Sequence, residues 1–222
     1  MDYISLMNSR HAVRQYTDEE ITGEVLNALK DEIKRIEKES HIKFNLVLNE
    51  PLAFDCYLSN KLGFKGVKNY IVITGPKGFE NEMLGGYYGE QIVLKAQQLG
   101  LNTCWVAHTF SKKKLQYNLE KGEQLICVIT IGYGETQGKS HKNCSIDKLC
   151  DFRGDMPHWF MSGMDTAMLA PTAKNEQKFC LVLRNRNEVT LKSRGGSCKG
   201  VTLGIVKFHF EIGAGKENFE FV

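Results

Sequence analysis

The chain has 222 residues, of which 42% are hydrophobic and 25% charged, and its net charge is +3. This composition is ordinary for a globular protein with one ample core or two small ones. The charge is too small, and the basic residues too scattered, to favour binding to nucleic acid, and no apolar run approaches the ~20 residues of a membrane span.

The N-terminus lacks the apolar segment of a signal peptide. The seven cysteines are scattered, and no two of them form a C-x-x-C pair. Cys144 and Cys150, with His141 nearby, make a poor zinc pattern. We therefore expect free thiols, no metal site and a reducing, cytoplasmic location.

Hydrophobic periodicity predicts mixed helices and strands in the first part of the chain. Helices are expected over 18–38, 87–99 and 112–119, and strands over 44–48, 70–74, 103–107 and 125–131. Thr17 and Glu20 have the spacing of a capping box, which would start the first helix directly after a basic segment. The polar stretch 135–143 is the best candidate for an internal junction.

The same types of element follow this junction. The pattern predicts a helix over 159–169, a loop over 171–177, a hairpin of 179–183 with 188–192, a helix over 201–212 and an edge strand over 219–222. Because helices and strands mix without a regular βαβ alternation, we expect an α+β fold rather than a doubly wound sheet. The repetition suggests two related half-domains, residues 1–143 and 144–222.

Two short segments indicate a ligand. Arg10, His11 and Arg14 set two guanidiniums and an imidazole within five residues, and planar Arg donors grip a phosphate in bidentate fashion. Residues 171–177 form a turn of small residues with two amides, which can read the polar edge of a flat ring. A phosphate tail joined to such a ring is the description of FMN.

Simpler interpretations of both segments stay open. Arg10 and Arg14 could pair with Asp18 or Glu19 as surface charges. Residues 171–172 could be an ordinary turn between a helix and a strand. The joint occurrence of the two segments favours the flavin site.

Four segments together resemble the FMN-dependent nitroreductase family. Residues 10–16 are similar to its opening Arg-Arg-Ser-x-Arg-x-Phe segment, and residues 170–178 to its flavin-lining Ala-Pro-Ser-Ala-x-Asn-x-Gln-Pro segment. Residues 99–105 and 129–134 match a strand entry and the strand that closes the sheet. Ala12 stands where the family often has Ser, and Lys178 where it has Pro.

The resemblance implies a nitroreductase-like fold, in which a mixed or antiparallel sheet packs with helices. It implies that Arg10, His11, Ala12 and Arg14 hold the FMN phosphate, with Lys142 completing that site. It further implies that the flavin ring is contacted by Trp105, Val106, Ala107, Pro171, Thr172, Ala173, Asn175 and Gln177.

The order of the segments departs from the usual family layout, because the Ala-Pro-Thr-Ala segment follows the central strands. The chain thus resembles nitroreductases in which one chain imitates the intertwined homodimer. In that arrangement Arg10 and Arg14 would meet residues 172–177 around a single FMN. A monomeric pseudo-dimer and a homodimer both stay open.

The implied activity is transfer of two electrons from NADH or NADPH to a nitroaromatic, a quinone or a similar acceptor in a ping-pong cycle. No catalytic acid or base is assigned, although His108 and His158 are conceivable proton donors. The alternatives are a dehalogenase-like flavoenzyme, or a flavin-binding or cofactor-less sensor that keeps the fold.

Overall fold

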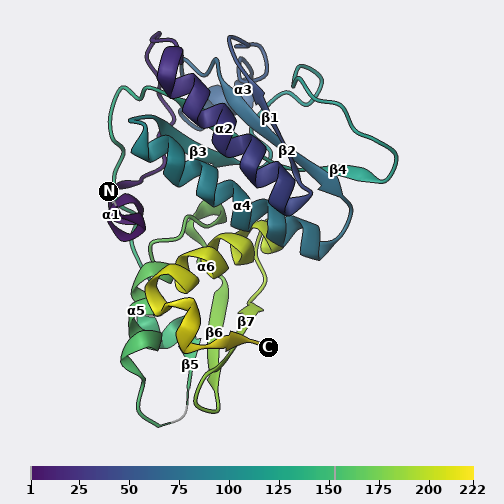
Figure 1. Ribbon diagram of the computed structural model, residues 1–222. Coiled ribbons are helices and arrows are strands. Elements are labelled where there is room, and N and C mark those ends of the chain that lie inside the picture. The colour runs from purple at the N-terminus through teal and green to yellow at the C-terminus, as the bar shows by residue number, and fades with distance from the viewer. Residues whose placement is uncertain (1, 153) are drawn as a thin grey trace.

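The computed structural model describes residues 2–152 and 154–222, which are arranged around two four-stranded sheets (Figure 1). The first sheet has the strand order β1-β2-β4-β3, and all of its neighbouring strands are antiparallel. Its strands are β1 (Lys43–Val47), β2 (Tyr70–Pro76), β3 (Asn102–Val106) and β4 (Glu123–Gly132). The helices of this part are α1 (Tyr3–Ser9), α2 (Gly23–Ser40), α3 (Tyr57–Lys61) and α4 (Phe79–Gln98).

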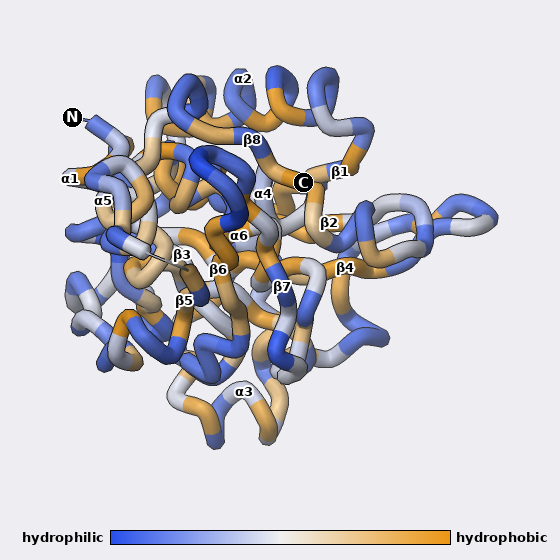
Figure 2. Tube along the Cα trace, turned by 90° about the horizontal axis from the view of Figure 1, so that it is seen from below, coloured by the Kyte–Doolittle hydropathy of each residue, from blue (hydrophilic) through white to orange (hydrophobic). Residues whose placement is uncertain are grey.

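The first sheet is buried on both faces. Side chains alternate along a strand, so Ile71 and Ile73 of β2 pack into the cluster that includes α2 and α4. Tyr70 and Val72 point to the other face, where Phe54 covers them. The residues of α2 that face away from the sheet are polar, and those that face the sheet are apolar (Figure 2).

The second sheet has the strand order β5-β6-β7-β8, in which the central pair is antiparallel and the outer pairs are parallel. Its strands are β5 (Cys150–Asp151), β6 (Phe179–Arg184), β7 (Glu188–Ser193) and β8 (Glu220–Phe221). Helices α5 (His158–Ala167) and α6 (Lys199–Ala214) lie beside it, and short 3-10 helices span Ile146–Lys148, Ala173–Asn175 and Lys216–Asn218. The molecule is α+β, as the sequence predicted.

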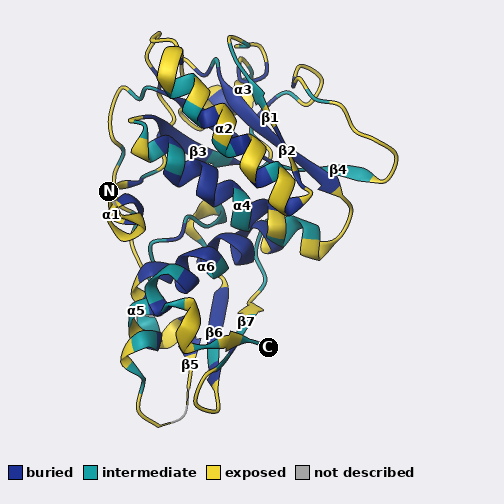
Figure 3. Ribbon diagram, viewed as in Figure 1, coloured by how far each residue is buried: buried dark blue, intermediate teal, exposed yellow. Residues whose placement is uncertain are grey.

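Helices α4 and α6 cross where the two sheet layers meet, and both are deeply buried there (Figure 3). Their backbones touch at glycines. A Cβ on Gly86 would overlap the carbonyl oxygen of Val201, and one on Gly204 would overlap that of Met83. The crossing thus requires residues without side chains at these two positions.

Two predicted helix starts are wrong. Helix α2 begins at Gly23 rather than 18, because the chain is still extended at Thr17, whose N–H bonds to the Tyr133 carbonyl. The capping box does not form; Thr22 is the N-cap residue. Helix α4 begins at Phe79 rather than 87. Its early glycines resemble a turn in sequence, but Gly85 packs against Ile73 and Ile126 of the first sheet and Gly86 against α6.

The helix predicted over 112–119 is also wrong. Residues 111–115 make a single turn, and the backbone then bonds to distant partners. The N–H of Gln116 donates to the Tyr70 hydroxyl, and its carbonyl accepts from the Asn45 amide. The expected strands, the hairpin and the last helix are confirmed to within a few residues. None of the helices within 2–152 and 154–222 is both long and apolar enough to cross a membrane.

Candidate functional site

A cavity of about 560 Å³ lies between the first sheet and the start of α6. This volume is within the range of small-molecule sites. One side, the N-terminal wall, consists of Arg10, His11, Ala12, Arg14, Cys104, Trp105 and Ala107. The other side, the C-terminal wall, consists of Pro171, Thr172, Ala173, Lys174, Asn175, Cys198, Val201, Thr202 and Ile205. Lys139 and His141, from the segment between the sheets, also line the cavity.

The basic segment reaches the cavity because it is pinned to β3. Helix α1 ends at Ser9, and the chain then runs extended, with Ala12 bridged to Thr103 and the Val13 N–H donating to the Thr103 carbonyl at 3.0 Å. Val13 is buried in the core. Ala12 and Arg14, its neighbours, lie at the cavity.

Arg10 is the most deeply buried cation of the site, with 4% of its surface exposed. Its Nε lies 3.7 Å from Oε1 of Glu90, too far for a hydrogen bond. Within the described chain this Nε has no hydrogen-bond partner. A buried donor left without a partner is costly, so Arg10 is suited to a further acceptor supplied by a ligand.

The cavity is strongly cationic. Arg10, Arg14, Lys139 and Lys174 line it, and no Asp or Glu of residues 2–152 and 154–222 does. The pKa of His11 is lowered, first by its burial and then by the charge of Arg10. Both causes disfavour a further positive charge on His11 beside the buried Arg10.

Trp105 forms the floor of the N-terminal wall. Its Nε1 donates to Oε2 of Glu90 at 2.8 Å, and its ring lies so close to Gly89 that a Cβ there would collide with it. Ala107 lies on the same face of the strand. The side chain of Val106 points to the opposite face and packs in the core, away from the cavity.

The C-terminal wall combines one face of α6 with residues 171–175, which belong to a loop in an unusual conformation. Lys174, Asn175 and Gln177 have φ angles of 52°, 55° and 48°, in the left-handed region that residues with a Cβ seldom occupy. Gln177 is buried, and its amide holds the segment between the sheets: Nε2 donates to the Lys142 carbonyl at 2.8 Å, and Oε1 accepts from the Cys144 N–H at 2.9 Å. Such strain persists only where the surroundings enforce it.

The structure brings together most of the residues named from the sequence. Arg10, His11, Ala12, Arg14, Trp105, Ala107, Pro171, Thr172, Ala173 and Asn175 all line the cavity. Val106, Lys142 and Gln177 are not among its lining residues. Lys142 is exposed and contributes its backbone carbonyl to Gln177, whose amide is occupied by backbone partners. Asp18 pairs with Lys68, so the surface pairing considered for the arginines is not formed with it.

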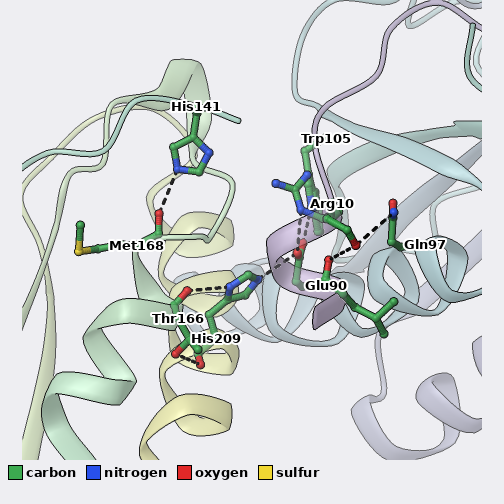
Figure 4. Close-up of polar contacts among 10 residues, drawn as sticks. Arg10, Glu90, Gln97, Trp105, His141, Thr166, Met168 and His209 are labelled. Atoms are coloured by element: carbon green, nitrogen blue, oxygen red, sulfur yellow. Dashed lines mark hydrogen bonds and ion pairs between the residues drawn. The ribbon is translucent and has the colours of Figure 1, made fainter. Parts of the chain in front are cut away.

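Sequence reasoning missed several lining residues. These are Cys104, Lys139, His141, Lys174, Cys198, Val201, Thr202 and Ile205. The signal for three of them was the spacing of Val201, Thr202 and Ile205 on one face of a helix, but only the crossing with α4 places that face at the cavity. His141 is held there by a contact of 3.0 Å between its Nε2 and the Met168 carbonyl (Figure 4).

Known proteins share this fold. The profile of a family described as "Putative TM nitroreductase" matches residues 2–214. A solved structure described as a "putative nitroreductase" from Thermotoga maritima is 22% identical, with a TM-score of 0.67 and coverage of 98% of this chain and 85% of its own. No curated protein sequence matches the chain.

Two other solved structures are similar over a smaller share of this chain. A "putative nitroreductase in complex with FMN" from Desulfovibrio desulfuricans is 14% identical, with a TM-score of 0.53 and coverage of 71% of this chain and 99% of its own. A "putative NAD(P)H:FMN oxidoreductase" from Staphylococcus epidermidis is 13% identical, with a TM-score of 0.52 and coverage of 70% and 96%. At these identities the likeness concerns the fold.

Proposed function

This chain belongs to the family described as "Putative TM nitroreductase", and on that premise we propose that it is an oxidoreductase that binds FMN in the cavity between its two sheets. The observation that carries the proposal is the composition of that cavity: four cations and no carboxylate among the described residues, beside a loop of small residues. A dianionic phosphate joined to a flat polar ring satisfies both features.

We assign the phosphate to the basic segment. Arg10 and Arg14 supply guanidinium donors, one of which has a buried Nε without a partner, and the backbone at His11 and Ala12 lies alongside. Lys139 is the cation from the intervening segment that lines the cavity; it takes the role that the sequence suggested for Lys142.

We assign the flavin ring to the space between Trp105 and Ala107 on one side and the loop 171–175 on the other. The bound flavin would supply the hydride and electron transfer. Asn175 offers amide groups to the ring edge, although its Nδ2 also donates to the Lys142 carbonyl at 2.9 Å. Val201 and Ile205 give the cavity an apolar surface that excludes water.

The proposed donor is NADH or NADPH, and the proposed acceptor is a nitroaromatic, a quinone or a similar compound, reduced in a ping-pong cycle. No side chain is assigned as catalytic acid or base. His108 and His158 are exposed and do not line the cavity, so solvent is the proton source in this scheme.

We also propose that residues 1–143 and 144–222 are related halves that imitate a nitroreductase dimer. Each contains a four-stranded sheet with helices packed beside it, and the long helices α4 and α6 cross at the boundary. The cavity is formed by residues of both halves, as a site at a subunit interface would be.

The proposal is tested by the visible spectrum of the purified protein, before and after incubation with FMN and removal of the excess. We expect flavin absorption that bleaches anaerobically on addition of NADH or NADPH and returns when a quinone or a nitroaromatic is added. A protein that retains no FMN would contradict the proposal and favour the cofactor-less binding protein. Bleaching without turnover of either acceptor would leave the flavin site standing and overturn the acceptor class.

Replacement of Arg14 by Ala tests the phosphate assignment. We expect FMN affinity to fall at least tenfold, because a charge-assisted contact of ~1.5–3 kcal/mol is lost. The free energy of unfolding should change little, because Arg14 is exposed and the variant loses only the contact of its guanidinium with the Phe64 ring. The control is Lys112→Ala, which removes the same charge from an exposed position outside the cavity; equal affinities in the two variants would remove Arg14 from the site.

A further inference from the structure

A buried contact between a glutamate and a histidine joins α4 to α6 directly behind the cavity, and the proposed function makes no use of it. Glu90 of α4 and His209 of α6 are both 0% exposed, and His209 Nε2 lies 3.1 Å from Glu90 Oε1 (Figure 4). The other ring nitrogen, Nδ1, lies 3.0 Å from the Thr166 carbonyl oxygen on α5. Both nitrogens of the imidazole therefore face oxygen acceptors.

The hydrogen-bond partners fix the number of protons in this pair. A carbonyl oxygen can only accept, so Nδ1 must carry a hydrogen. Nε2 faces a carboxylate oxygen, and two lone pairs at 3.1 Å would repel each other, so a proton must lie between them. Whichever of the two residues carries that proton, the pair is neutral overall, and together with the Arg10 guanidinium, 3.7 Å from the same Oε1, the three residues carry one positive charge.

The same carboxylate holds two residues of the cavity wall. Its Oε2 accepts from the Trp105 indole, and its Oε1 is the nearest anion to Arg10. The groups that contact the pair thus come from the end of α1, from β3 and from α5. Any change in Glu90 is transmitted directly to the wall that lines the cavity.

We propose that Glu90 and His209 are positioning residues, which share one buried proton and thereby hold Arg10 and Trp105 at the wall of the cavity with a net positive charge behind them. The structural part of this inference is independent of the ligand, whereas its consequence for FMN binding rests on the proposed function. The two parts have separate tests.

The first test counts the proton in the protein without FMN. A free imidazole loses its proton near pH ~6.5, so above that pH the folded protein keeps a proton that the unfolded chain has released. The folding equilibrium constant of the wild type should then fall relative to that of Glu90→Gln between pH 7.5 and 9, by up to about tenfold per pH unit for one retained proton. Parallel pH dependences in the two proteins would overturn the inference.

Glu90→Gln is the informative variant because it removes the negative charge while keeping a side chain of nearly the same size. The amide oxygen can still accept from Trp105, and the amide nitrogen can donate to a neutral His209. If this variant does not fold, nitrogen NMR of the wild type at pH 8 replaces it. We expect Nδ1 of His209 to carry a hydrogen and Nε2 to share a second one with Glu90; a single ring hydrogen, with no proton shared with Glu90, would overturn the inference.

The second test measures FMN affinity. Glu90→Ala should weaken it at least tenfold, because Trp105 loses its acceptor and Arg10 loses the carboxylate nearest to it, and Glu90→Gln should recover most of the loss. The matched control is Glu211→Ala, which removes a carboxylate on α6 that is 8% exposed and lies outside the cavity, where it accepts from Tyr87 of α4 at 2.6 Å. Equal losses in Glu90→Ala and Glu211→Ala would reduce Glu90 to a structural role.

The outcomes separate the two proposals. A wild type that shows the proton linkage but binds no FMN would contradict the proposed function and leave the buried pair intact. A wild type that binds FMN with no proton linkage would contradict the buried pair and leave the flavin site intact.

Discussion

On the strand of the N-terminal wall of the cavity the backbone is regular and side chains bond to side chains, whereas in the loop 171–177 of the C-terminal wall the backbone is irregular and a side chain bonds to backbone. Trp105 stands on a strand, and Glu90 bonds its indole. Across the cavity, three residues between 174 and 177 have left-handed backbones, and the Gln177 amide bonds two backbone groups of the segment between the sheets.

The difference teaches where each wall is vulnerable. A charge removed from the N-terminal wall leaves other buried charges behind it, which is expensive in a low-dielectric interior. An amide removed from the C-terminal wall frees a segment of chain that has no helix or strand of its own to hold it. We therefore expect substitutions in the N-terminal wall to lower the free energy of unfolding more. Substitutions in the C-terminal wall should mainly make the segment between the sheets less ordered.

The largest effect is expected for Arg10→Ala. It removes the buried cation beside Glu90 and should lower the free energy of unfolding by about 3 kcal/mol, with loss of FMN binding. Denaturant titration and FMN titration measure the two effects. Arg10→Lys, which keeps the charge but not the planar donors, should fall between this variant and the wild type. An unchanged denaturation midpoint in Arg10→Ala would contradict the expectation that substitutions in the N-terminal wall lower stability more.

Gln177→Ala should have the next largest effect. It leaves the Cys144 N–H without its partner and the Lys142 carbonyl with only the Asn175 amide, at a cost of about 2 kcal/mol. FMN binding should weaken because the loop loses its anchor, and proteolysis near residues 139–144 should accelerate. Gln98→Ala, at an exposed position, is the control and should stay within about 0.5 kcal/mol of the wild type. Equal stability of the two variants would mean that the loop is held by other contacts.

A smaller effect of opposite sign is expected for Lys174→Gly. Lys174 has a φ of 52°, and glycine adopts this conformation without steric cost, so the variant should gain about 0.5 kcal/mol. Lys178→Gly loses the same charge and side chain at a position without a left-handed backbone, and it should lose stability instead. A loss in both variants would show that the strain at Lys174 is negligible.

The smallest effect concerns His11. Its pKa is lowered by burial and by Arg10, so the unfolded chain takes up this proton at a higher pH than the folded protein does. The stability that follows is present above the ordinary histidine range and is lost as the pH falls through it. His11→Gln should therefore lose less stability than the wild type between pH 7.5 and 5.5. Identical pH dependences would exclude this contribution.

Much of the fold could be predicted from the sequence because its strands are short apolar runs between turns. The strand expected over 103–107 differs from β3 by one residue. The start of α4 was missed because Gly85 and Gly86 are poor helix formers, and only their packing against the first sheet and α6 offsets this cost. The residues of the basic segment could be predicted because two arginines and a histidine lie within five positions, a spacing that suits a phosphate.

The C-terminal wall could be predicted only in part. Its small residues were evident, but the direction of the Gln177 side chain depends on a segment more than thirty residues earlier. Val201, Thr202 and Ile205 reach the cavity through the crossing of two helices, and no local pattern encodes that crossing. Glu90 and His209 are 119 positions apart, and no sequence pattern around either residue predicts contact with the other.

The single-chain origin of both walls has a consequence for behaviour on dilution. A cavity assembled from separate subunits is lost when the protein concentration falls below the dissociation constant of the assembly. Here the backbone contacts of Gly86 and Gly204 and the continuous chain keep the two walls at a fixed, high effective concentration. The occupancy of the cavity should accordingly depend on the concentration of its ligand and not on that of the protein, down to the most dilute samples that can be measured.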